Sequence, residues 1–326
     1  MLKCSSGIKA IFTLSALFAF ALSLATARTA AAEEILILTG TDPNFLPITV
    51  ASEKGFFKAE GLDVTQRLFP SGADAMLAFR GIGAQFVAAG DIPSILLWSE
   101  FSDSVGIAPI FASTGNLFGV VSSTIKDPKD LIGKKVATKK SSTSEYFIDT
   151  YLRKNGIDPK QLNVIDLSPP EMVPAMVGGQ IDGFFIWRPY PAQAQKILGD
   201  KVRVLTSAEG YYVERILLNA NRTFATKNPE IVHKVLRAIQ KAIDYSNQNI
   251  DEASAVMARK IKTDPSIVKD VLSINPFNLK YDAESAKDLE GLSQFLVDRG
   301  RLKQPVQITK AFDASYLRAV NPKLAP

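Results

Sequence analysis

Apolar and polar positions alternate in a regular way from residue 34 to about residue 101. Short apolar runs predict strands at residues 34–39, 62–69 and 84–89, and each run is followed by a stretch with helical spacing. The three helical stretches begin near Pro47, Ala75 and Pro93. Strands and helices that alternate at this pitch predict an α/β fold, with a parallel sheet covered by helices on both faces.

The rhythm changes between residues 105 and 122, where two predicted strands, 105–111 and 117–122, follow each other without a helix. We place the crossing into a second lobe there. The strand–helix pattern then resumes, with strands expected at 136–138, 163–167, 181–187 and 202–205, and helices after Ser142 and at 171–177. A return strand is expected at 215–220, followed by helices near 229–243, 251–261, 265–272 and 282–297.

These elements predict three parts: a signal peptide at 1–32, a first lobe of residues 33–121 and 219–326, and a second lobe of residues 122–218. Two lobes suit the 294 residues that follow residue 32, since a single core divides at roughly 250–300 residues. Two lobes joined by two crossing strands, with a helical C-terminal tail, form a hinged clamshell that closes on a ligand.

The stretch from Gly178 to Tyr190 is the focus of the predicted second lobe. Its two glycines end a helix, and the apolar run Phe184–Ile186 is typical of a strand covered on both faces. Pro189 restricts Arg188 to an extended backbone and can begin a new helix. Trp187 and Arg188 are therefore expected at a strand end, where α/β sheets bind their ligands.

The N-terminus has the pattern of an export signal. Two lysines precede an uncharged apolar run, residues 11–25, and three alanines, residues 30–32, end it. We expect cleavage before Glu33, with cleavage after Ala27 as the alternative. The apolar run is too short to span a bilayer comfortably, so a soluble protein in the periplasm is expected.

Removal of residues 1–32 takes three basic residues and no acid, which lowers the formal net charge from +5 to +2. A charge this small gives no reason to expect nucleic acid or an anionic membrane as a partner. Cys4, the single cysteine, is expected to leave with the signal, and lipid attachment is the alternative. With His233 as the single histidine, we expect no metal site, no cofactor and no cysteine–histidine or serine–histidine catalytic pair.

Three blocks of sequence resemble the periplasmic solute-binding proteins of ABC importers, in the nitrate, sulfonate and taurine group. They are residues 47–64 (PITVASEKGFFKAEGLDV), 130–136 (DLIGKKV) and 176–190 (MVGGQIDGFFIWRPY), in the family's order. The resemblance covers roughly residues 33–222. It implies the two-lobed fold of type II with two crossing strands, and capture of a ligand for delivery to a membrane permease, without chemistry on the ligand.

Trp187 and Arg188 are the first candidates for ligand contact. The resemblance implies that the residue between this tryptophan and Pro189 reaches the cleft and is often acidic, so the arginine is a departure. A guanidinium presents a fork of donors to a carboxylate or sulfonate. The alternative is an arginine that pairs with an acid of the facing lobe as a closure latch. We expect Trp187 to pack against the cleft floor with one edge open.

The turn Lys139–Ser144 is the second candidate. The N-terminus of a helix presents free N–H groups and a partial positive charge, and hydroxyls are added here. Resemblance implies that this turn holds the head group of the ligand. We expect one hydroxyl of Ser141, Ser142 or Thr143 to touch the ligand, and we expect Lys139 and Lys140 to be surface residues. In the alternative, Ser142 only caps the helix and the lysines are solvated.

In the first lobe, the candidates follow predicted strands and are Asn44, Phe45, Ser71, Gly72, Asp91, Pro93, Thr114 and Asn116. Asp91 is expected to cap the helix that follows it; its alternative is to accept from the amine of a zwitterionic ligand. Tyr211 and Tyr212 precede the return strand and are candidates for a cleft wall, and Tyr212 is retained as a ligand-binding candidate.

These observations predict a monomeric binding protein, not an enzyme, that captures a small organic anion for an ABC permease and ATPase. An alkyl- or arylsulfonate, a taurine-like compound or a related carboxylate is the expected ligand. One alternative is an enzyme that makes the thiamine pyrimidine on the same fold, which would need a cysteine-rich loop and a histidine. The other alternative is a periplasmic sensor domain, which the sequence does not distinguish from a transport receptor.

Overall fold

The computed structural model describes residues 33–274 and 277–325. The two sheets and the helices that cover them belong to one unit of the chain, Glu34–Pro326. The predicted signal peptide, residues 1–32, and Cys4 lie outside the described residues. Among the residues described, no helix has the length and apolar character needed to cross a bilayer.

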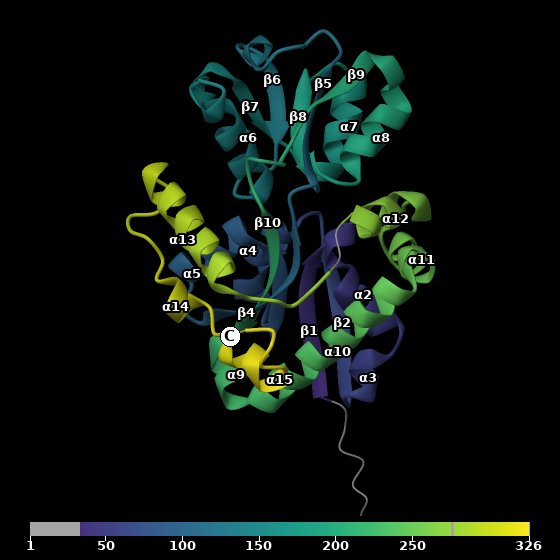
Figure 1. Cartoon of the computed structure of the whole chain (residues 1–326), viewed down its shortest axis with the longest axis vertical. Helices are drawn as coiled ribbons and strands as arrows, with labels where there is room; N and C mark the ends of the chain where they lie inside the picture. The colour runs from purple at the N-terminus through teal and green to yellow at the C-terminus, as the bar shows by residue number, and fades with distance from the viewer. Residues whose placement is uncertain (1–32, 275–276, 326) are drawn as a thin grey trace, which may run out of the picture. The chain divides into compact units, whose positions relative to one another are not determined.

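The first sheet has five strands in the order β2-β1-β3-β10-β4 (Figure 1). Strands β1 and β3 are parallel, with Ile37 opposite Phe86, whereas β10 is antiparallel to β3 and β4. The strands are β1 (Glu33–Gly40), β2 (Leu62–Phe69), β3 (Phe86–Gly90), β4 (Ser104–Ser113) and β10 (Glu214–Asn221). The helices that connect the first four are η1 (Pro43–Phe45), α2 (Leu46–Glu53), α3 (Phe56–Ala59), α4 (Gly72–Ile82) and α5 (Asp91–Glu100).

The second sheet repeats this plan in the order β7-β6-β8-β5-β9. Strand β6 is parallel to β7 and β8, and β5 is antiparallel to β8 and β9. The strands are β5 (Leu117–Ser122), β6 (Lys135–Thr138), β7 (Asn163–Asp166), β8 (Gly183–Trp187) and β9 (Val202–Ser207). The helices are η2 (Pro128–Leu131), α6 (Thr143–Lys154), η3 (Pro159–Gln161), α7 (Pro169–Val177), α8 (Tyr190–Leu198) and η4 (Gly199–Lys201).

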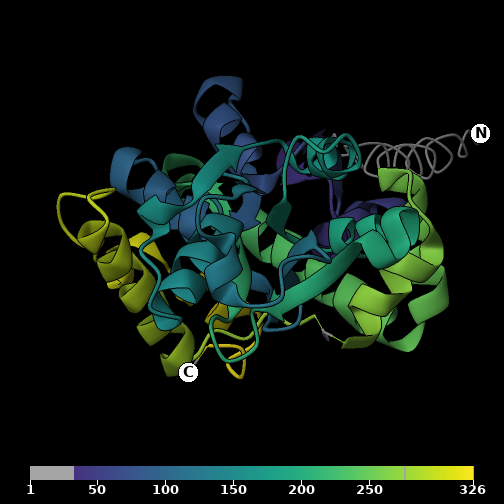
Figure 2. The same cartoon turned by 90° about the horizontal axis from the view of Figure 1, so that it is seen from above.

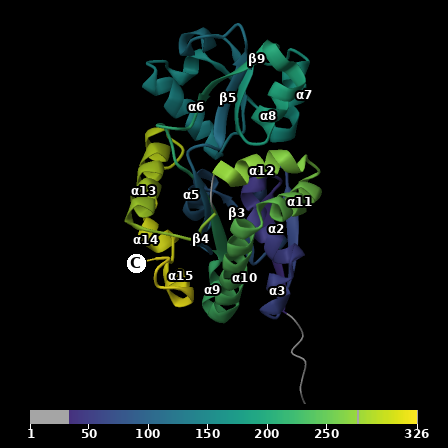
Figure 3. The same cartoon turned by 45° about the vertical axis from the view of Figure 1, so that its right-hand side comes forward.

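The chain after β10 is helical, as predicted. It contains α9 (Arg222–Lys227), α10 (Pro229–Gln248), α11 (Ile250–Ile261), α12 (Pro265–Ile274), α13 (Ala283–Asp298), α14 (Ile308–Ala311) and α15 (Ser315–Val320). Helix α10 packs against α2, and α13 packs against α5. Seen from above, α13 and the α10–α12 group lie on opposite sides (Figure 2), and the turned view in Figure 3 gives the same arrangement.

The chain passes between the two sheets twice. Residues 114–116 lead from β4 to β5, and residues 208–213 lead from β9 to β10. We call the elements built on the first sheet the first lobe and those built on the second sheet the second lobe. The predicted lobe limits, 121/122 and 218/219, fall inside β5 and β10, and each of these strands pairs within one sheet. The sheets therefore change a few residues earlier than those limits, which otherwise stay a prediction.

The local sequence explains why β8 forms as predicted and why one predicted helix is broken in two. Phe184, Phe185 and Ile186 are fully buried in β8, as the apolar run predicts for a strand covered on both faces. The helix expected to begin near Pro47 is divided into α2 and α3, because Gly55 between them has φ +74°. This left-handed conformation suits glycine and interrupts an α-helix.

Phe185 is a sensitive point of the second lobe's core. Its ring lies 5.4 Å from that of Phe147 and 5.6 Å from that of Tyr151, measured between centroids. It also lies against the backbone of Gly119, where an added Cβ would be 2.7 Å from the ring.

We expect Phe185→Ala to lower the free energy of unfolding by about 3–5 kcal/mol, because it removes a fully buried ring and leaves a cavity. Ile197→Ala on α8 is the control, since Ile197 is 62% exposed and should change stability by at most ~0.5 kcal/mol. Urea unfolding measures both values. A loss for Phe185→Ala no larger than that of the control would contradict this account of the core.

Candidate functional site

A small cavity lies where strand ends of the two lobes meet. Its volume is about 20 Å³, which leaves room for about one water molecule. It lies beyond the carboxyl ends of β1, β3 and β8, the position at which α/β sheets bind ligands. Its lining residues are Asp42, Asn44, Phe45, Gly72, Ala73, Gly90, Pro93, Ser142, Thr143, Trp187, Glu214 and Ile216.

Glu214 connects the two lobes at this cavity. It is the first residue of β10 and is 1% exposed. One carboxylate oxygen accepts a hydrogen bond from Asn116 Nδ2 at 2.5 Å, and the other accepts from Thr143 Oγ1 at 2.8 Å. Burial raises the pKa of Glu214 to about 7, against the two hydrogen bonds, which lower it, and with a smaller contribution from the charge of Asp91.

Asp42 is a second buried carboxylate of the cavity. It is 3% exposed, and its Oδ1 accepts from the backbone N–H of Asn44 at 3.1 Å, which caps η1. Burial, followed by the charge of Glu214, raises the pKa of Asp42 well above its ordinary value. Among the residues described, neither Asp42 nor Glu214 has an ion-pair partner.

Three buried polar atoms beside these carboxylates have no hydrogen-bond partner: Asn44 Oδ1, Asn116 Oδ1 and Trp187 Nε1. Asn44 and Trp187 line the cavity, and Asn116 is bonded to Glu214. A buried donor or acceptor without a partner lowers the stability of the fold by roughly 1–3 kcal/mol. Such groups are therefore uncommon in native proteins, and each one needs a structural or functional reason. Together with the carboxylates, they make the cavity rich in acceptors, with one free indole donor.

Asp91 has a structural arrangement of its own. It begins α5, and its Oδ1 accepts from the backbone N–H of Ile92 at 2.8 Å and from the hydroxyl of Tyr212. Its Oδ2 accepts from the backbone N–H of Arg215 at 3.0 Å. Burial raises the pKa of Asp91 to about 6, although the bond from Tyr212 and the charge of Arg215 lower it. The N-cap of α5 is Gly90 and no side chain caps this helix, so the predicted capping role of Asp91 is wrong. Both of its oxygens accept hydrogen bonds from protein groups, and the amine contact stays a prediction.

The turn before α6 reaches the cavity through two of its three candidate hydroxyls. Ser142 caps α6 by accepting from the N–H of Ser144, and Thr143 donates to Glu214. Ser141 lines a separate hollow. Lys139 is less exposed than the surface residue that we expected: its Nζ lies 2.9 Å from Asp74 Oδ1 of the first lobe, and its side chain is 16% exposed.

Arg188 does not line the cavity. Its Nε donates to the carbonyl of Gly115 at 3.3 Å, and its guanidinium lies 4.7 Å from the ring centroid of Phe118. The reason is the register of β8 on β5, which places Trp187 opposite Leu117 and so carries Arg188 past the end of the strand pair. Burial lowers the pKa of this half-buried guanidinium. The expected cation is therefore absent from the described lining, and carboxylates occupy the cavity instead.

The other candidates fall into three groups. Asn44, Phe45, Ser142, Thr143 and Trp187 line the cavity. Thr114 and Tyr212 line another hollow, of about 580 Å³, and Ser71 caps α4 by accepting from the N–H of Asp74. Whether any of them contacts a ligand stays a prediction.

Sequence reasoning missed Asp42 and Glu214. Asp42 lies in the turn directly after β1, two residues before the candidate Asn44. Glu214 is a charged residue at the start of a strand that is otherwise apolar in its centre. An acid at the carboxyl end of a strand, and an acid where a crossing segment becomes a buried strand, are the two signals that point to them.

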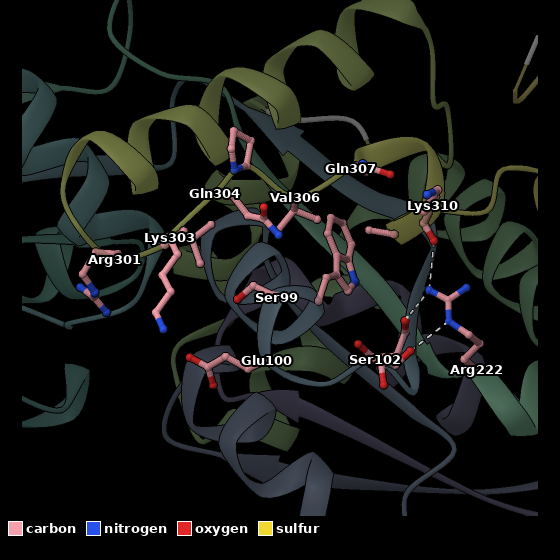
Figure 4. Close-up of a pocket in the computed structure, with 15 residues that line it drawn as sticks. Ser99, Glu100, Ser102, Arg222, Arg301, Lys303, Gln304, Val306, Gln307 and Lys310 are labelled. Atoms are coloured by element: carbon pink, nitrogen blue, oxygen red, sulfur yellow. Dashed lines mark hydrogen bonds between the residues drawn. The ribbon is translucent and has the colours of Figure 1, made fainter.

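A much larger hollow, of about 930 Å³, lies between the end of α5 and the segment between α13 and α14 (Figure 4). None of the sequence candidates lines it. The guanidinium of Arg222 at its edge donates to the carbonyls of Ser102, Ser104 and Lys310, at 2.8–3.1 Å. These bonds tie the turn after α5 to α14, so a structural role explains them. The smaller cavity, with its partnerless buried groups, is the better candidate site.

Two mixed sheets, the first of which is completed by β10 after the chain has passed through the second, define the two-lobed fold of periplasmic binding proteins, as expected. The NMT1/THI5 like family model matches residues 42–253. The chain therefore belongs to the NMT1/THI5 like family.

Two relatives are binding proteins by name. A binding protein of Brucella abortus is 24% identical over 280 residues, which cover 83% of this chain and 86% of the relative. The taurine-binding periplasmic protein of Escherichia coli is 32% identical over 192 residues, or 57% of this chain and 58% of the relative.

Solved structures agree on the fold. The alkanesulfonate-binding protein SsuA from Xanthomonas axonopodis pv. citri, bound to MOPS, superposes with a TM-score of 0.77 at 20% identity, over 87% of this chain and 99% of that chain. The desulfurization enzyme DSZB also matches, with a TM-score of 0.65 at 14% identity, over 88% of this chain and 98% of that chain. The fold is thus shared by binding proteins and by at least one enzyme.

The raised pKa of Glu214 predicts a pH dependence of stability. The carboxyl binds its proton more tightly in the folded protein, with a pKa of about 7 against an ordinary value of 4.5. Its stabilising contribution is complete below pH 4.5 and is lost as the pH rises through about 7. We expect Glu214→Gln to remove this loss, and therefore to be more stable than the wild type at about pH 8.

Urea unfolding at about pH 5 and about pH 8 measures the difference. Glu209→Gln, at an exposed position, is the control and should follow the wild type at both pH values. A parallel pH profile for Glu214→Gln and the wild type would show that Glu214 does not titrate in this range.

Gly90 allows the two lobes to come together. A Cβ atom at this position would lie 2.5 Å from Thr143 Cγ2, across the junction. We expect Gly90→Ala to hold the lobes apart and to increase the radius of gyration, measured by small-angle X-ray scattering. Gly81→Ala on α4 is the control, because an added Cβ meets no atom within 4 Å there. Equal radii for the two variants would contradict the close approach.

Proposed function

We propose that this protein is the substrate-binding component of an ABC importer, and that it captures a small organic ligand in the cleft between its lobes outside the cytoplasm. Family membership supports the binding role, since relatives from two bacterial species carry binding-protein names. The cavity in its closed form admits about one water molecule. Ligand entry therefore requires the lobes to open and then to close around the ligand.

We further propose that the ligand carries a protonated nitrogen. The single observation that carries this step is the pair of buried carboxylates, Asp42 and Glu214, without an ion-pair partner among the described residues. Asn44 Oδ1 and Asn116 Oδ1 are free acceptors beside these carboxylates, and an N–H group of the ligand could donate to them as well. A buried charge is strongly unfavourable unless it is paired, and an ammonium group on the ligand would supply the pair.

The ligand also carries an acidic group in this proposal. The helices α4, α5 and α6 begin at or beside the cavity, and their N-termini favour negative charge. The free indole N–H of Trp187 is a further donor. A small zwitterion, such as an amino sulfonate of the taurine kind or an amino carboxylate, satisfies both sets of groups. A simple alkylsulfonate leaves the carboxylates unpaired and is disfavoured by them.

A binding role fits the chain better than an enzymatic one. His233 lies on α10, where its ring nitrogen is 3.3 Å from Glu230, and it does not line the cavity. Cys4 precedes the described residues. The cysteine-rich loop and histidine of the thiamine-pyrimidine alternative are thus not found at the cleft. A role as a sensor for a signalling partner is tested by whether an importer permease binds the loaded protein.

We expect taurine to raise the melting temperature of the purified protein more than ethanesulfonate, which lacks the amine, or ethylamine, which lacks the acid. A ligand at about 100 times its Kd stabilises by about 2.7 kcal/mol, enough to detect. We expect Glu214→Gln to weaken binding of the amine-bearing probe by roughly tenfold or more, because it removes a charge-assisted hydrogen bond. Thermal shift and calorimetry measure these effects.

Glu209→Gln is the matched control and should bind as the wild type does. Equal stabilisation by taurine and ethanesulfonate would overturn the ammonium assignment and leave the importer role standing. Stabilisation only by neutral sugars or simple cations would overturn the zwitterion assignment altogether.

A further inference from the structure

A segment of the first lobe reaches across the junction to α6 of the second lobe. Helix α13 packs against α5, and the chain after it returns to β4, where the N–H of Asp313 donates to the carbonyl of Gly106. At the far end of α13, Phe295, Arg299 and Arg301 all contact α6 or the turn before it. We call residues 295–301 the strap.

The contacts of the strap with α6 are specific. The rings of Phe295 and Tyr146 meet edge to face, 4.5 Å apart between centroids. Both Nε and Nη2 of Arg299 donate to Asp149 Oδ2, at 3.1 Å and 2.9 Å. Arg301 Nη1 donates to Glu145 Oε2 at 3.1 Å. Glu145 and Asp149 are four residues apart and therefore lie on one face of α6.

Arg301 makes one more contact, with the turn that leads into the cavity. Its Nη2 donates to Ser141 Oγ at 2.7 Å, and the backbone N–H of Ser141 donates to the same Glu145 oxygen, at 2.7 Å. These bonds close a ring of three residues around Ser141. Ser141 has φ +58°, a left-handed conformation that a serine adopts only when its surroundings impose it.

The turn and the cavity are directly linked. Thr143 lies two residues after Ser141, lines the cavity and donates to Glu214. A change in the backbone of Ser141 would shift the start of α6 and with it Thr143. Arg301 therefore acts on the cavity through the turn, without lining the cavity itself.

We propose that the strap stabilises the closed arrangement of the two lobes, and that Arg301 is the positioning residue that fixes the turn of residues 139–144. The closure part of the proposal needs no ligand; the positioning part rests on the proposed function, in which this turn receives the ligand. Because Arg299 and Arg301 are 27% and 38% exposed, salt weakens these pairs.

Distance measurements between spin labels on the two lobes test the strap. The full chain with Cys4→Ser carries labels at Asp63→Cys and Lys160→Cys, two exposed positions on opposite lobes. We expect Arg299→Ala with Arg301→Ala to increase the ratio of open to closed molecules roughly fivefold, as the loss of two modest ion pairs predicts. About 1 M salt should move the wild type in the same direction.

Arg153→Ala is the matched control. Arg153 donates to the same Asp149 carboxylate, at 2.9 Å, but from within α6, so its removal leaves the strap in place. We expect the distribution of distances between the two spin labels to stay unchanged in this variant. Equal shifts for Arg153→Ala and the double variant would overturn the strap, as would a double variant whose distribution matches the wild type.

Hydrogen exchange tests the positioning role separately. We expect Arg301→Ala to speed exchange of the amides of residues 140–144 at least tenfold, since Ser141 loses the bonds that fix it. Arg301→Lys keeps the positive charge but loses the fork of donors. Compared with Arg301→Ala, it should recover more of the closed population than of the slow amide exchange in residues 140–144. Unchanged exchange in Arg301→Ala would overturn the positioning role. No probe ligand enters either measurement, so failure of the ligand screen would not affect them.

Discussion

The buried carboxylate of Glu214 is the constraint on which the junction of the two lobes depends. It accepts from Asn116 at the entry to β5 and from Thr143 at the start of α6, while it belongs to β10 of the first sheet. Its neighbour Asp42 adds a second carboxylate without a cation. A junction of this kind is most stable when a proton or a positive group neutralises it, so the closed arrangement and the charge of its occupant are coupled.

The junction has an inner layer of buried hydrogen bonds and an outer layer of partly exposed ion pairs. The inner layer is buried, and we expect its hydrogen bonds to Glu214 to respond to pH, because burial raises the pKa of the carboxyl. The outer layer, formed by Arg299 and Arg301 on α6, is partly exposed and responds to salt. We therefore expect closure of the lobes to respond to pH and to salt through separate sets of residues.

Local patterns predicted much of the fold, and the limits of prediction were non-local. The strand around Phe185 and the cap at Ser142 depend on neighbours within a few residues, so periodicity and capping rules were sufficient for them. The direction of Arg188 depends on the register of β8 with β5, and the pairing of Lys139 with Asp74 depends on how close the lobes come. The role of Glu214 follows from three segments that meet only in the folded chain. No local pattern carries that information.

The insertion of β10 between β3 and β4 also sets an order of assembly. All five strands of the second sheet lie within one continuous stretch, from Leu117 to Ser207, whereas the first sheet receives its fifth strand, β10, only from Glu214 onward. As the chain emerges from a ribosome or a translocation channel, the second sheet can be completed while β4 still lacks a partner on its inner edge. The first lobe is thus the first to be synthesised and the last to complete its sheet. Until β10 pairs, the first lobe exposes an unpaired strand edge, which favours aggregation.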